Sequence, residues 1–358
     1  MERIVEDDNV RLAILEVNRA HSNKGVVGWV LRTLEDRIAD LKRMAQDPNW
    51  QASPPRTFPL YDKSAGKLRP EVCEPPIWPD QYIHHMIVQA LEPVLMKGMD
   101  YWCCGSIPGR GISHGMKGIK RWLREDPKGT RYAAELDIKS FYRSINPRQV
   151  IRWLARKIKD RAALRLVWAI IKDGIKIGFY ISQWMANAML QPLDHIIREK
   201  LGIPHYLRYI DNLTMTASSK RKLHKAVKAI EKWLHSVGLR LKGNWQVYRV
   251  KDRMVSALGY RYDHNKTLLR KRNLLRLKRQ LSRAYKKLQK GLKIPFHMAA
   301  GLLSRIGQLK HCDSQQLRRR LIRPGMIKLL KDAVRKYGKI REERKKLWTK
   351  RPFTVLAQ

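Results

Sequence analysis

The stretch HYLRYIDNLTMTA, residues 205–217, constrains the fold more than any other part of the chain. Its aromatic and branched residues on both sides of Asp211 are typical of half-buried strands. Asp211 and Asn212 stand between the two halves, and we expect them to form the tip of a tight hairpin, because Asp and Asn tolerate positive φ. The chain should therefore contain an antiparallel sheet with a carboxylate at one edge.

A second acidic residue ends another expected strand. RYAAELDIKSFYRSI predicts a strand that stops near Asp137 and turns into a helix. If this strand neighbours the hairpin, the carboxylates of Asp137 and Asp211 emerge at the same edge. Such a pair suits two Mg²⁺ ions, with Mn²⁺ as a substitute, which together activate a 3′-hydroxyl and neutralise a departing pyrophosphate. A lone Asp at a strand end is usually a turn former or helix cap, so neither residue is decisive alone.

The charge of the chain points to a polyanionic partner. Its 75 Lys and Arg against 31 Asp and Glu give a net charge of +44, and nucleic acid is the expected partner for so basic a surface. An anionic membrane is the competing interpretation, but we find no run of about 18 apolar residues and no apolar leader after MERIVEDDNVR. We expect a cytoplasmic protein without membrane contact. The four cysteines (Cys73, Cys103, Cys104 and Cys312) lack metal-site spacing, and we expect reduced, buried thiols.

The pattern along the chain predicts three parts. Residues 1–60 begin with amphipathic helices, residues 61–265 mix helices and strands, and residues 266–358 are basic and helical. The middle part includes a helix from about Gln81 to Lys97, a long helix that ends at Gly202, and a basic helix from about Lys220. The Pro- and Gly-rich segment 48–81 should form loops and short extended pieces. These features predict an α+β fold.

The order of the motifs resembles that of reverse transcriptases. AELDIKSFYRSI resembles their A motif, IGFYISQWMANAML their B motif, and YLRYIDNLTM their C motif, normally Tyr-x-Asp-Asp. YDKSAGKLRP and SIPGRG are similar to the fingers motifs that precede A, while GLRLKGNWQV and ALGYRYD stand where D and E would be. The resemblance runs from roughly 60 to 265. It implies a right-hand polymerase with fingers and a palm, followed by a basic helical thumb.

The resemblance also implies roles for individual residues. Asp137 and Asp211, with the Ile138 carbonyl, would bind the catalytic metals, and Lys242 would protonate the leaving pyrophosphate. Tyr142 would select dNTPs by clashing with a ribose 2′-hydroxyl. The remaining positions would grip the triphosphate (Lys67, Arg69), lie near the nascent base pair (Gly178, Ser182, Gln183), hold the primer end (Leu258, Gly259, Tyr260) or contact nucleic acid (Arg110).

The chain departs from the family pattern at two motifs. Asn212 replaces the second Asp of the C motif, and its amide oxygen can ligate Mg²⁺ only weakly. The B motif IGFYISQ, residues 177–183, has Ile177 and Gln183 where the usual form Gln-Gly-x-x-x-Ser-Pro has Gln and Pro. This version looks like that of the reverse transcriptases of diversity-generating retroelements, which implies poor fidelity opposite template adenines. Lys67, Arg69, Tyr142 and Lys242 also have ordinary interpretations as solvated charges or packing residues.

The partners implied are an RNA template, a structured RNA from the same locus, a DNA primer or product, dNTPs and a small accessory protein on a basic surface. Basic stretches such as RRRLIRPGMIKLLK would bind phosphates, and Trp245, Tyr248 and Trp348 are candidates to stack on bases. Two alternatives remain. One is a defence-associated reverse transcriptase that makes template-biased or untemplated DNA, and the other is an RNA-binding scaffold whose site Asn212 has weakened.

Overall fold

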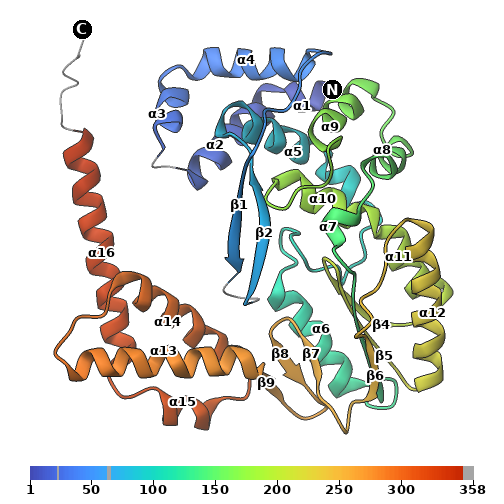
Figure 1. Ribbon diagram of the computed structural model, residues 1–358, viewed down its shortest axis with the longest axis vertical. Helices are drawn as coiled ribbons and strands as arrows, with labels where there is room; N and C mark the ends of the chain where they lie inside the picture. The colour runs from blue at the N-terminus through green and yellow to red at the C-terminus, as the bar shows by residue number, and fades with distance from the viewer. Residues whose placement is uncertain (22–23, 63–65, 350–358) are drawn as a thin grey trace. The chain divides into compact units, whose positions relative to one another are not determined.

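The computed structural model describes residues 1–21, 24–62 and 66–349. The chain forms two compact units (Figure 1). The first unit consists of Met1–Trp122 and Lys128–Arg249. The second unit consists of the short segment Leu123–Pro127 and the chain from Val250 onward. No helix of the described chain has both the length and the apolar character that a bilayer crossing requires.

The first unit begins with a layer of helices. These are α1 (Glu2–Val5), α2 (Asp7–Ala20), α3 (Gly25–Arg32) and α4 (Leu34–Gln46). The apolar stripe of α2, which includes Val10, Ile14 and Val17, is buried, and α2 packs against α5 (Tyr82–Met96). This burial follows the helical spacing of the apolar residues, so the expected N-terminal helices are present.

The Pro- and Gly-rich segment contains a two-stranded ribbon, the expected extended pieces. Strands β1 (Arg56–Asp62) and β2 (Lys67–Glu74) pair antiparallel and form the long hairpin of Figure 1. A distorted helical turn, η1 (Ile77–Gln81), leads into α5. The side chain of Lys67 and those of residues 339–358, which include Trp348, lie outside the described residues.

A four-stranded antiparallel sheet carries the expected acidic edge. Its strand order is β4-β5-β3-β6, and α12 (Lys220–Ser236) packs against β3, β5 and β6. The strands are β3 (Tyr132–Asp137), β4 (His205–Tyr209), β5 (Asn212–Ala217) and β6 (Gln246–Arg249). Alternating positions such as Leu136 and Met215 are buried in the main core. This core also contains residues of helices that precede the sheet in the chain and of helices that connect its strands. The α+β class expected from the sequence is confirmed.

The helices between β3 and β4 differ from the single long helix expected up to Gly202. α10 (Tyr180–Met189) stops at Leu190, and α11 (Gln191–His195) and the π-helical turn η2 (Ile196–Lys200) follow. Pro192 is the physical reason, because it has no N–H and its ring crowds the carbonyl four residues earlier. Three further helices lie between β3 and β4, namely α7 (Phe141–Ser144), α8 (Pro147–Ala155) and α9 (Arg161–Ile171), whereas α6 (Ile112–Glu125) precedes β3.

The second unit combines a small sheet with basic helices. Strands β7 (Val255–Ala257), β8 (Tyr260–Tyr262) and β9 (Thr267–Leu269) are antiparallel. The helices are α13 (Lys271–Gln289), α14 (Phe296–Gln308), the short turn η3 (Leu309–His311), α15 (Gln315–Leu321) and α16 (Met326–Thr349). Leu277 and Leu281 of α13 and Leu302 of α14 are buried, so these helices share a core although their outer faces are cationic.

Candidate active site

Strand register brings the two predicted carboxylates together. Asp137, the last residue of β3, pairs with Asn212, the first residue of β5. Asp211 precedes Asn212 in the β4–β5 hairpin, and its carbonyl accepts a hydrogen bond from the Ile138 N–H at 3.1 Å. Asp137 and Asp211 therefore lie at the same edge of the sheet, because the Asp137 strand does neighbour the hairpin.

The residues at the tip of this hairpin differ from those expected. Tyr209 pairs with Asn212, so the turn consists of Ile210 and Asp211, and Asn212 belongs to a strand. Ile210 carries the positive φ, +56°, a costly conformation for a β-branched residue. The expected Asp211–Asn212 tip is wrong because the pairing of Asn212 with both Tyr209 and Asp137 draws it into the sheet.

The two carboxylates form one electrostatic site. Burial raises the pKa of Asp211, and the negative charge of Asp137 raises it further, while Lys242 and Arg69 act in the opposite direction. Lys242 Nζ forms an ion pair with Asp137 Oδ1 at 2.6 Å, and its backbone N–H donates to the Asp137 carbonyl at 2.8 Å. Asp137, Asp211 and Lys242 therefore form one electrostatically coupled group at this edge of the sheet.

Hard divalent cations fit these donors. No group of three or more His, Cys, Asp or Glu side chains that could hold a metal occurs within the described ranges, so a cation here would rely on Asp137, Asp211 and weaker oxygen donors. Asn212 Nδ2 donates to Asp211 Oδ1 at 3.0 Å, which keeps its amide beside the carboxylate. An all-oxygen set with few protein ligands is what Mg²⁺ or Mn²⁺ accepts when phosphates and water complete the shell.

Tyr142 and Arg69 share this neighbourhood. Burial raises the pKa of Tyr142 to about 12, and the negative charge of Asp211 adds to the effect while Arg69 opposes it. Arg69 on β2 donates from Nη2 to Asp62 Oδ2 at 3.0 Å, which orients its guanidinium. The structure thus gathers Tyr142, Arg69 and Lys242 around Asp137 and Asp211.

The B-motif residues lie where α10 begins and contact the β1–β2 ribbon. The Ile177 carbonyl accepts a hydrogen bond from the Cys73 N–H at 2.7 Å. Gly178 has φ +109°, and a Cβ there would lie 2.2 Å from the Cys73 carbonyl oxygen. Ser182 is buried and Gln183 is exposed. The close backbone approach at Gly178 is therefore one to β2.

Four predicted site residues remain: Arg110 belongs to the first unit, and Leu258, Gly259 and Tyr260 follow later in the chain. Leu258 and Gly259 form the β7–β8 turn with φ +54° and +85°, and Tyr260 donates its hydroxyl to the Gln308 carbonyl at 3.0 Å. All three belong to the second unit. Arg110 donates to the Asp100 carbonyl at 3.1 Å, and its guanidinium lies 5.6 Å from the centre of the Tyr101 ring.

Three polar residues that support the hairpin were not among the predicted site residues. Arg208, Asp194 and Asn187 are fully or almost fully buried and are linked by hydrogen bonds. Arg208 stands in the middle of an otherwise apolar strand, and Asp194 interrupts the apolar residues after α10. A buried charge needs a partner, so these two positions were the available signal.

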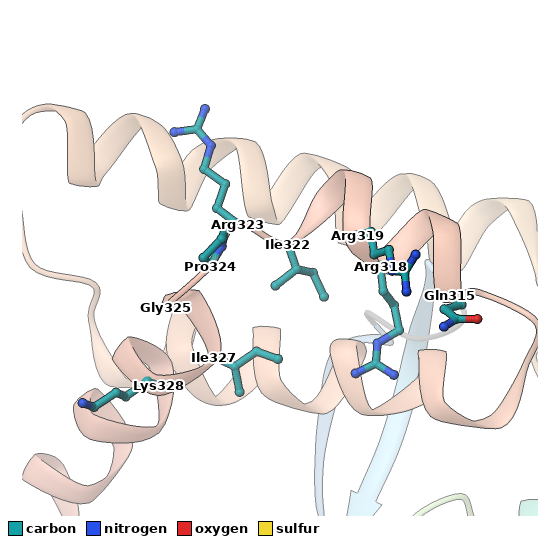
Figure 2. Close-up of a pocket in the computed structure, with 9 residues that line it drawn as sticks. All are labelled: Gln315, Arg318, Arg319, Ile322, Arg323, Pro324, Gly325, Ile327 and Lys328. Carbon is teal, nitrogen blue, oxygen red and sulfur yellow. The ribbon is translucent and has the colours of Figure 1, made fainter.

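A cavity of about 460 Å³ lies in the second unit (Figure 2). Ile322 and Ile327 face each other across it, Arg318 points toward it, and Arg323 points away. Arg323 instead places its guanidinium 4.6 Å from the Tyr285 ring centre. None of the described lining residues is acidic; they are Gln315, Arg318, Arg319, Ile322, Arg323, Pro324, Gly325, Ile327 and Lys328.

The cysteines and paired histidines have structural surroundings. Cys73, Cys103 and Cys104 are buried free thiols as expected, whereas Cys312 is partly exposed. Burial lowers the pKa of His84 to about 3, and the His85 ring stacks on Tyr180. The two adjacent histidines therefore pack on different neighbours, as expected for consecutive residues of a helix.

Comparison with known proteins gives a family match. The family model described as reverse transcriptase (RNA-dependent DNA polymerase) matches residues 61–262, more than half of the 358-residue chain. Protein YkfC of Escherichia coli K12 is 26% identical over 195 residues, 49% of this chain and 50% of that protein. The group II intron-encoded protein LtrA of Lactococcus lactis is 25% identical over 194 residues, 50% of this chain and 31% of that protein. This chain thus spans half or less of these relatives.

Among solved structures, the chain is similar to two yeast telomerases. The Candida albicans telomerase in complex with a telomeric RNA fragment has a TM-score of 0.47 and 10% identity, covering 60% of this chain and 46% of that one. The apo telomerase of Candida tropicalis has a TM-score of 0.46 and 12% identity, covering 61% and 48%.

Proposed function

Since this chain belongs to the reverse transcriptase (RNA-dependent DNA polymerase) family, we propose that it copies an RNA template into DNA by adding dNTPs to a primer. The observation that carries the proposal is the pairing of β3 with β5, which sets Asp137 beside the Asp211 hairpin. Two carboxylates at one sheet edge, surrounded by Lys242, Arg69 and Tyr142, provide the charge and positioning that phosphoryl transfer needs.

The three parts of the chain have separate roles in this proposal. Residues 1–60 are an N-terminal extension, residues 61–265 contain the fingers and palm, and residues 266–358 form the basic thumb and tail. The turn Leu258–Gly259 and Tyr260 hold the primer end, and Arg110 contacts the nucleic acid. The mixed sheet and helix composition of 61–265 and the basic helices after it support this division.

Divalent metal, two Mg²⁺ ions held by Asp137, Asp211 and the Ile138 carbonyl, would supply charge neutralisation at the reacting phosphate. The chain's own residues do the rest. Lys242, whose Nζ lies 2.6 Å from Asp137 Oδ1, balances part of the carboxylate charge and gives a proton to the departing pyrophosphate. Tyr142 closes the space beside the sugar 2′ position. Lys67 and Arg69 bind the triphosphate, with Arg69 oriented by Asp62.

We infer that the enzyme belongs to the diversity-generating branch and copies adenines poorly. The I-G-x-x-x-S-Q form of the B motif supports this inference. Gly178 brings the backbone against β2, and Ile177 and Gln183 stand on either side of it in the chain with Ser182 beside Gln183. A change in the side chains that pack on a templating base would loosen base discrimination there.

The net charge of +44 supports the proposed nucleic-acid partners. These are the RNA template, a structured RNA from the same locus, and the DNA primer or product. The cavity between α15 and α16 adds cations over an apolar floor, which suits a phosphate next to an exposed base. A small accessory protein would dock on a basic surface of the same kind.

Primer extension tests the proposal. The wild-type protein is given an RNA template, a DNA primer, dNTPs and Mg²⁺, beside Asp211→Ala and the control Asp36→Ala, which removes an exposed acid of α4. We expect Asp211→Ala to lose at least about 1,000-fold in rate, because metal sites supply several kcal/mol of charge stabilisation. Asp36→Ala should extend normally.

The products distinguish the alternatives. Errors concentrated opposite adenine support the diversity-generating branch, and product of biased composition without added template supports a defence-associated enzyme. No extension by the wild type, even with its co-purifying RNA bound, would contradict the polymerase and favour a scaffold.

A further inference from the structure

A buried ion pair lies directly behind the hairpin that carries Asp211. The side chains of Arg208 on β4 and Asp194 on α11 are both 0% exposed. Arg208 Nε donates to Asp194 Oδ1 at 2.8 Å and Nη2 donates to Oδ2 at 2.7 Å. This two-point contact uses both carboxylate oxygens, which sets the direction of the guanidinium as well as its position.

The remaining donors of Arg208 reach the tip of the hairpin. Nη1 donates to the Ile210 carbonyl at 3.1 Å and to Asn187 Oδ1 at 2.9 Å. The Ile210 carbonyl belongs to the peptide group that joins Ile210 to Asp211. Holding this carbonyl therefore fixes the plane from which the Asp211 side chain leaves the backbone.

Asn187 and Gly105 make a second set of contacts at the same turn. Asn187 Nδ2 donates to the Gly105 carbonyl at 2.7 Å, and a Cβ on Gly105 would lie 2.4 Å from Ile210 Cγ1. Gly105 thus lies against Ile210, and only a glycine leaves room for it. Asn187 links this loop to Arg208, so the same residue group surrounds the turn.

The turn held in this way is strained. Ile210 has φ +56°, and a β-branched residue keeps such a conformation only where its surroundings enforce it. A type of turn that favours glycine is formed here by isoleucine. Because relaxation of Ile210 would rotate the following peptide, it would also turn the carboxylate of Asp211 away from Asp137.

We propose that the buried Arg208–Asp194 pair is a positioning device for the Asp211 carboxylate, which it aims at the cation site through the Ile210 carbonyl. This inference rests on the proposed function, in which Asp211 ligates a divalent cation. Neither Arg208 nor Asp194 touches the reacting atoms. Their effect is on the geometry of a ligand, and the supporting residues of metal ligands commonly change affinity by 10–100-fold.

Replacement of the pair by apolar residues separates this role from stability. A buried ion pair can often be exchanged for apolar side chains of similar size without loss of stability, so Arg208→Met/Asp194→Leu should fold. We expect its affinity for Mn²⁺, measured by electron paramagnetic resonance without substrate, to fall about 10–100-fold. The Mg²⁺ concentration for half-maximal primer extension should rise by a similar factor.

Tyr206→Phe is the matched control. The Tyr206 hydroxyl donates to Asp194 Oδ1 at 2.7 Å and so belongs to the same buried group. The hydrogen bond to the Ile210 carbonyl comes from Arg208, and Tyr206→Phe leaves both of its partners in place. We expect this variant to melt at a lower temperature and to bind Mn²⁺ within about twofold of the wild type, since only a neutral hydrogen bond is lost. If the network acted only on stability, the Mn²⁺ affinity would change to the same extent in both variants.

Arg208→Lys decides the matter if the double variant does not fold. Lysine keeps the charge opposite Asp194 but loses the planar fork that reaches Ile210, so Mn²⁺ affinity should again fall. Wild-type Mn²⁺ affinity in a folded Arg208→Lys or double variant would overturn the inference. Wild-type protein that binds Mn²⁺ through Asp211 but does not extend primers would contradict the proposed function alone, whereas Mn²⁺ binding unaffected by Asp211→Ala would overturn the positioning role.

Discussion

Asn212 is the residue at which this site departs most from two paired acids. Its amide donates to Asp211 Oδ1 at 3.0 Å, so Asn212→Asp would place a third carboxylate beside Asp137 and Asp211. We expect a lower melting temperature in chelator, because the added charge repels its neighbours. The Mg²⁺ concentration for half-maximal extension should fall roughly tenfold, since an added charged oxygen ligand strengthens binding of a hard cation.

The control for this change is Asn265→Asp, which adds the same charge at an exposed turn of the second unit. It should alter neither the melting temperature in chelator nor the Mg²⁺ requirement. An unchanged Mg²⁺ requirement in Asn212→Asp would show that position 212 does not face the cation.

The buried His84 should make the stability of the fold depend on pH. Its ring is buried, neither nitrogen has a hydrogen-bond partner among the described residues, and burial lowers its pKa to about 3. Because the unfolded chain binds a proton near pH 6.5 and the folded one does not, stability is lost as the pH falls below that value. At pH 5 the penalty is about 2 kcal/mol.

Replacement of His84 by leucine should remove this penalty. Denaturant unfolding at pH 7.5 and pH 5 is expected to show a smaller loss of stability in His84→Leu than in the wild type. The exposed His235 on α12 serves as the control. Between pH 7.5 and pH 5, His235→Asn should lose as much stability as the wild type loses. A wild-type protein equally stable at both pH values would contradict the prediction.

Single residues also show where sequence reasoning stops. Asp137 and Asp211 were identifiable because each stands at the end of an expected strand, in a motif order that resembles that of reverse transcriptases. Their shared edge depended on the two strands being neighbours, a condition that the β3–β5 pairing meets. Ile210 was not identifiable, because its positive φ follows from the pairing of Asn212 on both sides and from Gly105, which lies far away in the chain. Local residue preference favoured an Asp-Asn tip, and tertiary contacts decided otherwise.

At the scale of elements, Gly178 joins the start of α10 to strand β2. A Cβ at Gly178 would lie 2.2 Å from the Cys73 carbonyl oxygen, whereas Gly174 has nearly the same φ, +107°, with nothing within 4 Å of a Cβ. Gly178→Ala therefore adds a backbone clash to the strain that both substitutions share. We expect it to cost at least about 2 kcal/mol more than Gly174→Ala, measured by denaturant unfolding.

The same pair of variants reports on the β1–β2 ribbon. A clash at Cys73 should break the bond from its N–H to Ile177 and raise hydrogen exchange in β2 in Gly178→Ala alone. Equal stability of the two variants would mean that the loop yields without disturbing the ribbon.

Elements with strong periodicity were predicted well, and boundaries set by single residues were not. The apolar stripes of α2, α12 and α13 identify these helices from sequence. The end of α10 could have been predicted only by letting Pro192 override the continuing apolar pattern. The Arg208–Asp194 pair could be found only in part, because a charged residue within an apolar pattern signals that it needs a partner but not which distant residue that partner is.

At the scale of the whole molecule, the charge of +44 makes binding to RNA a sum of many phosphate contacts. Such binding weakens linearly in log affinity against log salt, with a slope of about 0.7 per phosphate contacted on single strands. We expect Arg318→Ala/Arg319→Ala, which removes two cations from the cavity of Figure 2, to lower affinity for single-stranded RNA and to reduce the slope by about one to one and a half.

Charge alone does not account for that expectation. Arg335 of α16 is highly exposed, and its Nη1 lies 3.8 Å from Asp332 Oδ1. Arg335→Ala therefore removes a cation that is already near an acid and is outside the cavity. If the cavity is a phosphate site, Arg335→Ala should leave the salt slope almost unchanged, while substitution of Ile322 by Ser should weaken RNA binding without altering the slope, because only the apolar floor is changed. Fluorescence anisotropy across a salt series distinguishes these effects. The same reduction of the slope per cation removed in Arg335→Ala and in Arg318→Ala/Arg319→Ala would mean that RNA follows the overall field of the molecule rather than this cavity.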